Sequence, residues 1–384
     1  LTDVPIVGGG PAFSQEPLLY MEYLNLDYGI IGEGEQAFAK LIELISSNKN
    51  VTDLDGLVYK INNKYLINKN SFIPDLSIIP QLKNYSPDDF HEKYYKNGGY
   101  MTLQTKRGCG FKCVYCNYPR LEGTEYRFFP ISTIMETIKY FYKKYKIQYF
   151  YFVDSVFSTP LSFAKDVCRN IINSDMNIGW ETSINPRDVD EELIHLMKKA
   201  GCIGVSITPD SCCDEVLKSY NKGFSTRDIK NSINLLHKYN IPFDFYIILG
   251  GIGDNYEYFQ ETFQFCQEHL SEDVLIITYG MFLHKGCEAY NIAIKEKFLP
   301  ESGELKSAVF SNDFELLKKF RYFYQGQKER KKIIIKLRNN RHSKWILEND
   351  YYYDEESGSP RVIPEFRCKQ DQRPWYIGMK GLKL

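Results

Sequence analysis

The sequence of 384 residues lacks any apolar run of the roughly 18 to 20 residues needed to cross a bilayer. Its first residues, Leu1 to Val4, have neither the basic nor the apolar region of a signal peptide. It also lacks net charge, because 48 basic residues balance 49 acidic ones to −1. A general nucleic-acid binder would carry a basic excess. We therefore predict no transmembrane segment, no general nucleic-acid binding and a cytoplasmic location.

Familiar hydrolase signatures are missing as well. The six histidines are scattered, and no Ser/His/Asp set or H-E-x-x-H motif stands out. Ten cysteines in a chain without a secretion signal favour reduced thiols, metal ligation or catalysis over a disulfide framework. A hydrophobic content of 43% with 25% charged residues excludes intrinsic disorder as the main description.

Strands and helices alternate in the middle of the chain. The expected strands are 100–106, 148–153, 178–184, 203–207, 243–249 and 274–278. The expected helices are 131–145, 160–174, 190–200, 226–240 and 256–269. This alternation predicts an α/β fold whose parallel sheet has outer helices, either a partial or full barrel or an open doubly wound sheet.

The flanking segments differ from this core. Strands at 4–7 and 28–31 with a helix at 36–47 predict half of an α/β sandwich, which we expect to begin inside a domain. A hairpin (56–59 and 65–67) and a Pro-punctuated strap (72–85) follow. The tail is expected to be mainly helical. Its basic stretch, 328–344, predicts an amphipathic helix covering the barrel or a local surface for acidic partners.

Three cysteines follow the first central strand directly. Cys109, Cys113 and Cys116 form a C-x-x-x-C-x-x-C run on one short loop. Thiolates select zinc or iron–sulfur clusters, and a closed zinc site needs a fourth ligand that the neighbouring sequence does not supply. Three ligands on a four-iron cube leave one iron open to a chelating molecule such as S-adenosylmethionine (SAM). Packing or a degenerate zinc knuckle is the alternative interpretation.

This loop resembles the cluster motif of the radical SAM superfamily, whose members have a six-stranded partial barrel. Further motifs resemble those of members with an N-terminal cobalamin-binding domain. They are Val7-Gly8-Gly9-Gly10-Pro11, Ile31-Gly32-Glu33-Gly34-Glu35, Asp55-Gly56-Leu57-Val58-Tyr59, the segment 74–80, Phe152-Val153-Asp154-Ser155-Val156-Phe157, Asn185-Pro186-Arg187, Lys198-Lys199-Ala200-Gly201-Cys202, Asn221-Lys222-Gly223-Phe224 and Leu249-Gly250-Gly251. The resemblance covers roughly residues 4 to 285.

The resemblance implies four regions. They are a partial Rossmann-like, cobalamin-type α/β domain (1–50), a linker with hairpin and strap (51–98), a six-stranded TIM-like (β/α)6 partial barrel (99–285) and a C-terminal helical or loop extension (286–384). It also implies a 4Fe-4S cluster on Cys109, Cys113 and Cys116. SAM bound there would be cleaved reductively to a 5′-deoxyadenosyl radical that abstracts hydrogen.

Further SAM contacts follow from the same resemblance. Tyr115 would lie by the adenine or simply pack at the barrel mouth, and Asp154 and Ser155 would hold the ammonium or ribose unless Asp154 caps a helix. The remaining candidates are Ser206, Thr208 and Asp210 for the ribose, Lys222 for the carboxylate, and Gly250 and Gly251 for close approach to the adenine. The alternatives are a solvated surface lysine at Lys222 and a simple turn at Gly250 and Gly251.

Cobalamin binding stays open at this level. The D-x-H-x-x-G motif is not found, and the glycines at 8–10 and 32–35 could cradle part of a corrin. The leading hypothesis is a cobalamin-associated carbon methyltransferase acting on a small molecule or peptide, with flavodoxin or ferredoxin as electron donor. A cobalamin-independent radical SAM enzyme catalysing rearrangement, oxidation or sulfur insertion is the second, and a non-catalytic iron–sulfur protein the third.

Overall fold

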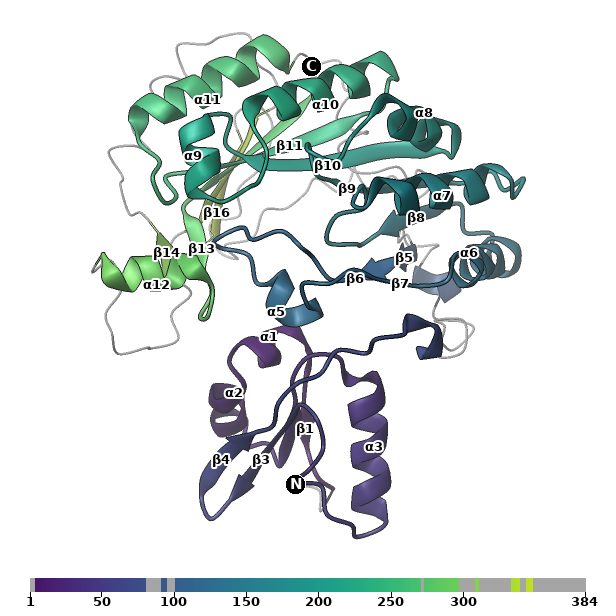
Figure 1. Ribbon diagram of the computed structural model, residues 1–384, viewed down its shortest axis with the longest axis vertical. Helices are drawn as coiled ribbons and strands as arrows, with labels where there is room; N and C mark the ends of the chain where they lie inside the picture. The colour runs from purple at the N-terminus through teal and green to yellow at the C-terminus, as the bar shows by residue number, and fades with distance from the viewer. Residues whose placement is uncertain are drawn as a thin grey trace.

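The computed structural model describes residues 4–80, 91–94, 101–270, 273–296, 308–310, 333–338 and 343–347. A small N-terminal α/β unit lies below a larger unit built on a curved sheet (Figure 1). None of the described helices is both long and apolar enough to cross a membrane. The helix α5 (Tyr118–Glu122) of the larger unit lies close to α1 (Gly10–Gln15) of the smaller one.

The N-terminal unit is a four-stranded sheet in the order β1-β2-β3-β4. Its strands are β1 (Val7–Gly8), β2 (Tyr28–Ile30), β3 (Leu57–Ile61) and β4 (Lys64–Ile67). Its other helices are α2 (Pro17–Tyr23) and α3 (Gly34–Ser46). The predicted hairpin is therefore part of this sheet, since β3 pairs antiparallel with β2. Asn62 and Asn63 turn it with φ of 49° and 60°, a conformation that asparagine tolerates.

The larger unit contains the expected six parallel strands. They are β5 (Met101–Leu103), β8 (Tyr149–Phe152), β9 (Gly179–Ile184), β10 (Cys202–Asp210), β11 (Phe243–Leu249) and β12 (Val274–Tyr279), paired in this order. The outer helices are α6 (Ile131–Tyr145), α7 (Leu161–Ile172), α8 (Glu191–Lys199), α9 (Asp214–Ser219), α10 (Thr226–Lys238) and α11 (Tyr256–His269). The predicted partial-barrel fold is thus confirmed.

Alternation along the strands separates the two faces of this sheet. On β9, Trp180 and Thr182 are fully buried, whereas Glu181 and Ser183, which alternate with them along the strand, are only half-buried. The buried side chains pack with outer helices in one large core, in which Trp180 stacks on Phe152 at 4.8 Å between ring centroids. The half-buried set faces the inside of the curved sheet, as the period of two requires.

The tail differs from the expected helix. Its described strands are β14 (Ala308–Phe310), β15 (Ile333–Arg338) and β16 (Ser343–Leu347), and β14 pairs antiparallel with β13 (Met281–Leu283), which follows β12. Strand β15 pairs parallel with β12, and β16 pairs antiparallel with β15, so the sheet has eight strands. The amphipathic helix predicted over 328–344 is therefore wrong at these positions, because edge pairing outweighs the helical preference of the charged residues. One described tail helix, α12 (Glu288–Lys295), agrees with the expectation.

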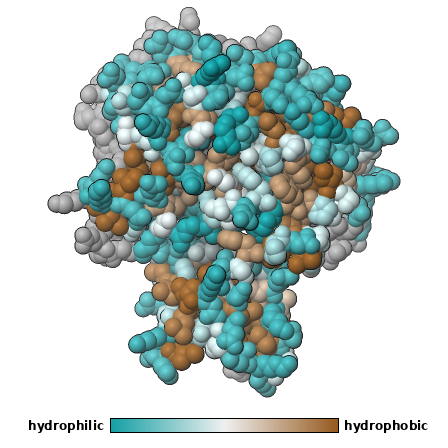
Figure 2. Space-filling model, viewed as in Figure 1, coloured by the Kyte–Doolittle hydropathy of each residue, from teal (hydrophilic) through white to brown (hydrophobic). Residues whose placement is uncertain are grey.

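Apolar side chains gather on the exposed surface of the N-terminal unit (Figure 2). They include Leu18 at 45% exposure, Leu24 at 53% and Ile67 at 45%. The buried part of this unit is small, with Leu41, Leu57 and Met21 at its centre. The described residues thus cover the apolar surface of this unit only in part.

Candidate iron–sulfur and cofactor site

The cysteine loop is held at both ends by backbone hydrogen bonds. It follows β6 (Lys106–Arg107), which pairs antiparallel with β7 (Arg127–Phe128). The amide of Cys109 donates to the Gly123 carbonyl at 3.0 Å, and the amide of Val114 donates to the Tyr220 carbonyl at 3.1 Å. Gly108 has φ of 94°, and a Cβ there would lie 2.0 Å from the Glu125 carbonyl oxygen. Only glycine fits where the loop leaves the strand.

The three predicted cluster ligands lie together in a mostly buried environment. Burial raises the pKa of Cys109 and Cys113, and raises that of Cys116 to about 12, with a further contribution at Cys116 from the charges of the other two. Hydrogen bonds from the Phe111 backbone and from the hydroxyls of Ser155 and Tyr126 partly offset this effect at Cys109. Without metal the thiols are protonated, and a cluster would displace three protons.

The sulfurs of the cysteine loop do not form a single-ion site like that of zinc. Tetrahedral zinc holds thiolates about 3.8 Å apart, given a Zn–S bond of about 2.3 Å. The described ligand groups whose atoms all lie within 4.8 Å of one another do not include Cys109, Cys113 and Cys116. These three sulfurs are therefore not gathered around a single-ion position, and three thiolates are the ligand set that leaves one iron of a four-iron cluster open.

Three predicted cofactor residues form one buried cluster beside this loop. The Lys222 ammonium donates to Asp210 Oδ2 at 2.6 Å, to Tyr115 Oη at 2.9 Å and to the Thr208 carbonyl at 2.9 Å. Tyr115 also donates to Asp210. Burial opposes the charge on Lys222, but the neighbouring Asp210 and Cys113 more than offset it, so its pKa is raised. Lys222 and Asp210 thus form a buried ion pair next to the cysteine loop.

Gly250 and Gly251 lie on the other side of this cluster. A Cβ at Gly251 would come within 2.1 Å of Tyr220 Oη, and the Tyr220 ring packs edge-on against Tyr115 with centroids 6.1 Å apart. The Gly250 amide, at a φ of 74°, donates to Asp254 Oδ2 at 2.7 Å. The two glycines therefore let the turn after β11 approach the aromatic residues behind the cysteine loop.

Asp154 and Ser155 contact the residues that lead into the cysteine loop. Asp154 is fully buried and accepts hydrogen bonds from the Thr105 amide and hydroxyl at 2.7 and 2.5 Å and from the Lys106 amide at 3.2 Å. The Ser155 hydroxyl donates to the Gly108 carbonyl at 3.1 Å. These contacts position the start of the cysteine loop. Pro160, not Asp154, is the N-cap of α7, and the SAM contacts predicted for both residues stay predictions.

The two remaining candidates on β10 lie in different surroundings, because the pairing of β10 with β11 becomes irregular between Ile207 and Asp210. Ser206 is half-buried on the inner face of the sheet and hydrogen-bonds with Asp244. The Thr208 side chain is exposed, and its carbonyl rather than its hydroxyl contacts Lys222. Of the three ribose candidates, the structure thus brings Asp210 to the cysteine loop. The ribose contact itself stays a prediction.

Four contributing residues were not identified from the sequence. Lys106 lies fully buried below the loop and donates to the Phe157 carbonyl at 2.8 Å. Glu122 accepts from the Gly108 amide at 3.3 Å, Tyr126 bonds to Cys109, and Asp254 holds Gly250. Glu122 and Tyr126 follow the cysteines within a few positions, which is the one signal that could have indicated them.

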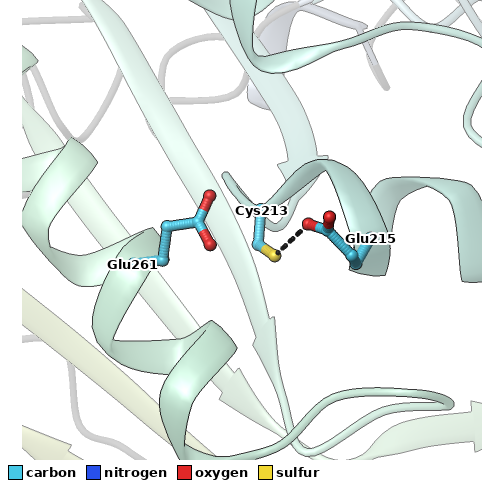
Figure 3. Close-up of side chains that lie close together, drawn as sticks. All are labelled: Cys213, Glu215 and Glu261. Carbon is cyan, nitrogen blue, oxygen red and sulfur yellow. Dashed lines mark hydrogen bonds between the residues drawn. The ribbon is translucent and has the colours of Figure 1, made fainter.

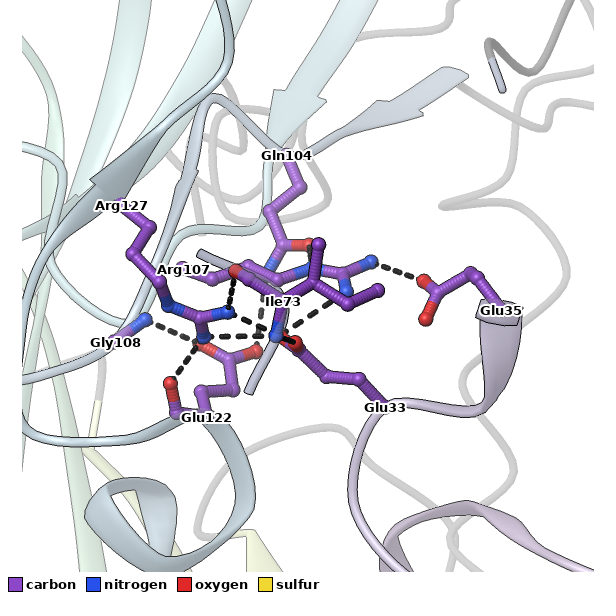
Figure 4. A network of polar contacts seen from close by, with 8 residues as sticks. All are labelled: Glu33, Glu35, Ile73, Gln104, Arg107, Gly108, Glu122 and Arg127. Atoms are coloured by element: carbon purple, nitrogen blue, oxygen red, sulfur yellow. Dashed lines mark hydrogen bonds and ion pairs between the residues drawn. The ribbon is translucent and has the colours of Figure 1, made fainter. Parts of the chain in front are cut away.

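An ion-pair network joins the N-terminal unit to the cysteine loop (Figure 4). Glu33 is bidentate to Arg127 at 2.8 and 2.9 Å, lies 3.2 Å from Arg107 and accepts from the Ile73 amide at 2.7 Å. Glu35 accepts from Arg107 at 2.5 Å. Burial opposes ionisation of Glu35, yet Arg107 holds its pKa below the ordinary value. Both carboxylates of the Gly-Glu-Gly-Glu turn thus bind the larger unit.

The glycines predicted to cradle a corrin differ in how much space surrounds them. A Cβ on Gly10 or Gly34 would meet no atom within 4 Å, whereas one on Gly32 would lie 2.2 Å from the Asn70 amide nitrogen. Both turns follow parallel strands, β1 and β2, whose carboxyl ends face the larger unit (Figure 1). This edge has room for a ligand at Gly10, while its carboxylates are already engaged.

A second cysteine group lies where α9 begins, next to α11 (Figure 3). Cys213, Glu215 and Glu261 have ligand atoms within 4.8 Å of one another, and the Cys213 thiol donates to Glu215 at 3.2 Å. Burial raises the pKa of Cys213 to about 12, and both glutamates are exposed. We interpret the group as a thiol–carboxylate hydrogen bond rather than a metal site.

A parallel α/β sheet with an open three-cysteine loop at its carboxyl edge defines the architecture of a cluster-binding enzyme. Residues 103–266 match the Radical SAM superfamily. An uncharacterized methyltransferase of Pyrococcus horikoshii is 25% identical over 304 residues, which are 77% of this chain and 64% of that protein. An anaerobic magnesium-protoporphyrin IX monomethyl ester cyclase of Synechocystis sp. is 25% identical, covering 63% of this chain and 49% of that protein.

A solved structure extends the likeness to the fold. The radical SAM methyltransferase TsrM of Kitasatospora setae, with cobalamin and a [4Fe-4S] cluster bound, superposes with a TM-score of 0.70 at 22% identity. The match covers 80% of this chain and 60% of that one. Residues 103–266 are therefore similar to the radical SAM superfamily, as the motifs predicted, and the chain spans less than two thirds of the relatives it matches.

Proposed function

We propose that this protein is a radical SAM enzyme that cleaves SAM reductively at a 4Fe-4S cluster and uses the resulting radical chemistry on a small-molecule or peptide substrate. The observation that carries the proposal is the loop of Cys109, Cys113 and Cys116, whose three sulfurs lie beside the buried Lys222–Asp210 ion pair. When bound, the cluster and SAM supply a 5′-deoxyadenosyl radical.

The described side chains support this chemistry by holding charge and shape in place. Lys222 uses its three donors on Asp210, Tyr115 and the Thr208 carbonyl, so this ion pair holds Tyr115 in position beside the cysteine loop. Asp154 and Lys106 anchor the loop from inside the sheet. Gly250 and Gly251 keep bulk away from the opposite wall, where the adenine would bind.

Anaerobic reconstitution with iron and sulfide followed by addition of SAM and dithionite tests the proposal. We expect 5′-deoxyadenosine to form with the wild type and to fall to background in Cys113→Ala. Cys168→Ala is the matched control, because Cys168 is buried in the sheet core away from the loop and should leave nucleoside production unchanged. A fully loaded cluster that yields no 5′-deoxyadenosine would contradict the proposal.

Carbon methylation with cobalamin is the specific reaction we favour. It is supported by the likeness to two methyltransferases and by the open edge at Gly10 facing the larger unit. The enzyme supplemented with hydroxocobalamin should retain the corrin through gel filtration and form methylcobalamin from SAM, visible in the absorption spectrum. Unchanged corrin together with normal SAM cleavage would instead support a cobalamin-independent reaction such as oxidation or rearrangement.

The likeness to a cyclase favours an oxidative reaction as the second candidate. For either reaction we propose a flavodoxin or ferredoxin as the low-potential electron donor. We further propose a cytoplasmic location, supported by the nine described cysteines, which are all free thiols. Replacing dithionite by reduced flavodoxin in the cleavage assay tests the donor.

A further inference from the structure

The inner face of the sheet carries a cluster of polar side chains that the proposed function does not use. Four adjacent strands contribute Tyr151, Glu181, Ser183, Ser206, Asp244 and Tyr246. Alternation directs these side chains inward, because Thr182, Val205 and Phe245 between them are completely buried against the outer layer.

Strand register brings the group together. Tyr151 pairs with Glu181, Ser183 with Ser206, and Ser206 with Asp244 as neighbours across the parallel ladder. Side chains paired in this way point to the same face of a sheet. The negative charges of Glu181 and Asp244 both act on Tyr151 and on Tyr246, and raise the pKa of each phenol further than burial alone. The six side chains thus form one inward-facing site.

Asp244 is the unusual member of this site. Its residue is 2% exposed, and its Oδ2 accepts from the Tyr246 hydroxyl at 3.2 Å. Its Oδ1 is buried and receives no hydrogen bond from any described residue. Burial raises the pKa of Asp244 to about 6, and hydrogen bonds from Ser206 and Tyr246 offset only part of that effect. A buried carboxylate oxygen without a donor is costly, and a charged donor would relieve the cost.

We propose that this site binds the ammonium or guanidinium group of the substrate, with Asp244 as its main acceptor and Glu181 as a second negative charge. The proposal rests on the radical SAM function and names the chemical class of its substrate. A hydrogen-bonded cation gives Oδ1 a donor and compensates the charge of Asp244, whereas a neutral donor only gives Oδ1 a hydrogen bond.

The position of the site also limits substrate length. Ser206 and Asp210 lie on the same strand, four residues apart, and Asp210 belongs to the cluster beside the cysteine loop. Because β10 is irregular between them, Ser206 pairs with Asp244 and Asp210 with Ile247, three positions further along β11. At about 3.3 Å per residue, the inner site lies about 10 Å below that layer. The substrate should therefore place its cationic group roughly this distance from the carbon that reacts.

Isothermal titration calorimetry at about pH 8 on the reconstituted full chain with SAM tests the proposal, because Asp244 and hexylamine are both charged there. Hexylammonium is the probe and 1-hexanol its neutral counterpart. We expect the amine to bind at least about tenfold more tightly than the alcohol, and Asp244→Asn to remove that preference. Asp273→Asn is the matched control, since Asp273 is equally buried but bonds to His237 on α10.

Each outcome decides the proposal. Equal binding of amine and alcohol, absence of amine binding, or an Asp244→Asn variant that binds like wild type would overturn it. Glu181→Gln, at a half-buried position, should also weaken amine binding and covers the case in which Asp244→Asn does not fold. Production of 5′-deoxyadenosine is measured in the same samples without amine. If it is normal while amine binding fails, only the substrate class is wrong.

Discussion

Replacing Glu33 by glutamine should loosen the contact between the N-terminal unit and the cysteine loop. Glu33 is the centre of the network in Figure 4, with a side chain only 5% exposed. It neutralises Arg127 and Arg107, whose side chains are 10% and 14% exposed. Glutamine keeps the size of the side chain but removes its charge and one of its two acceptor oxygens.

The expected cost follows from the partners that remain. Breaking a buried ion pair by removing one partner costs about 3–5 kcal/mol. Arg127 would keep the carbonyls of Ile73 and Glu122, and Arg107 would keep Glu35. We therefore expect the free energy of unfolding to fall by about 2–3 kcal/mol, at or just below the lower end of this range.

Urea denaturation and hydrogen-exchange mass spectrometry measure the two consequences. The variant should unfold at lower urea, and amides in the cysteine loop, including Gly108 and Cys109, should exchange faster. Glu43→Gln is the control in the same unit, because Glu43 forms an exposed pair with Lys40 and should change neither measurement. A Glu33→Gln variant that behaves like Glu43→Gln in both would refute the assignment of Glu33 as the contact between the units.

Three further outcomes follow from the site. Gly251→Ala should displace Tyr220 and reduce SAM cleavage. Gly34→Ala is the control, because a Cβ there meets nothing within 4 Å. Equal activity of the two variants would contradict the close approach of Gly251 to Tyr220. Tyr126→Phe removes a hydrogen bond from Cys109 and should lower the cluster reduction potential in a spectroelectrochemical titration, with Tyr118→Phe as control. Burial raises the pKa of Asp254 to about 6, so the native state holds this proton more tightly than the unfolded chain. The stability of the wild type relative to Asp254→Asn should therefore fall as the pH rises from about 4 to about 6, and a constant difference would show that Asp254 does not titrate in this range.

Much of the fold could be predicted because its signals are local. Apolar spacing predicted the helix at 131–145, and α6 occupies the same residues. The tail strand β15 was missed because Ile333, Ile334 and Ile335 form a short apolar run flanked by basic residues, which periodicity cannot assign. Its pairing with β12 depends on a partner far away in sequence.

The candidate site, like the fold, could be predicted where its signals are local and not where it depends on residues far apart in sequence. The spacing of the three cysteines indicated a metal centre, and Asp210 and Lys222 were both named as cofactor residues. Their contact with each other could not be predicted, because it depends on how the turn after α9 folds back onto β10. Asp244 was missed for a related reason, since a single carboxylate in an apolar strand becomes distinctive only when its buried oxygen is seen to have no donor.

The pairing of β12 with β15 has a consequence for synthesis of the protein. The partner strand begins about fifty residues after β12 ends, so at about 5–20 residues per second the ribosome needs about 3–10 seconds to deliver it. During that time β12 is an open parallel edge able to pair with a neighbouring nascent chain. Expression yield should therefore depend on chaperones that act within this interval, and truncations between the two strands should accumulate as aggregates.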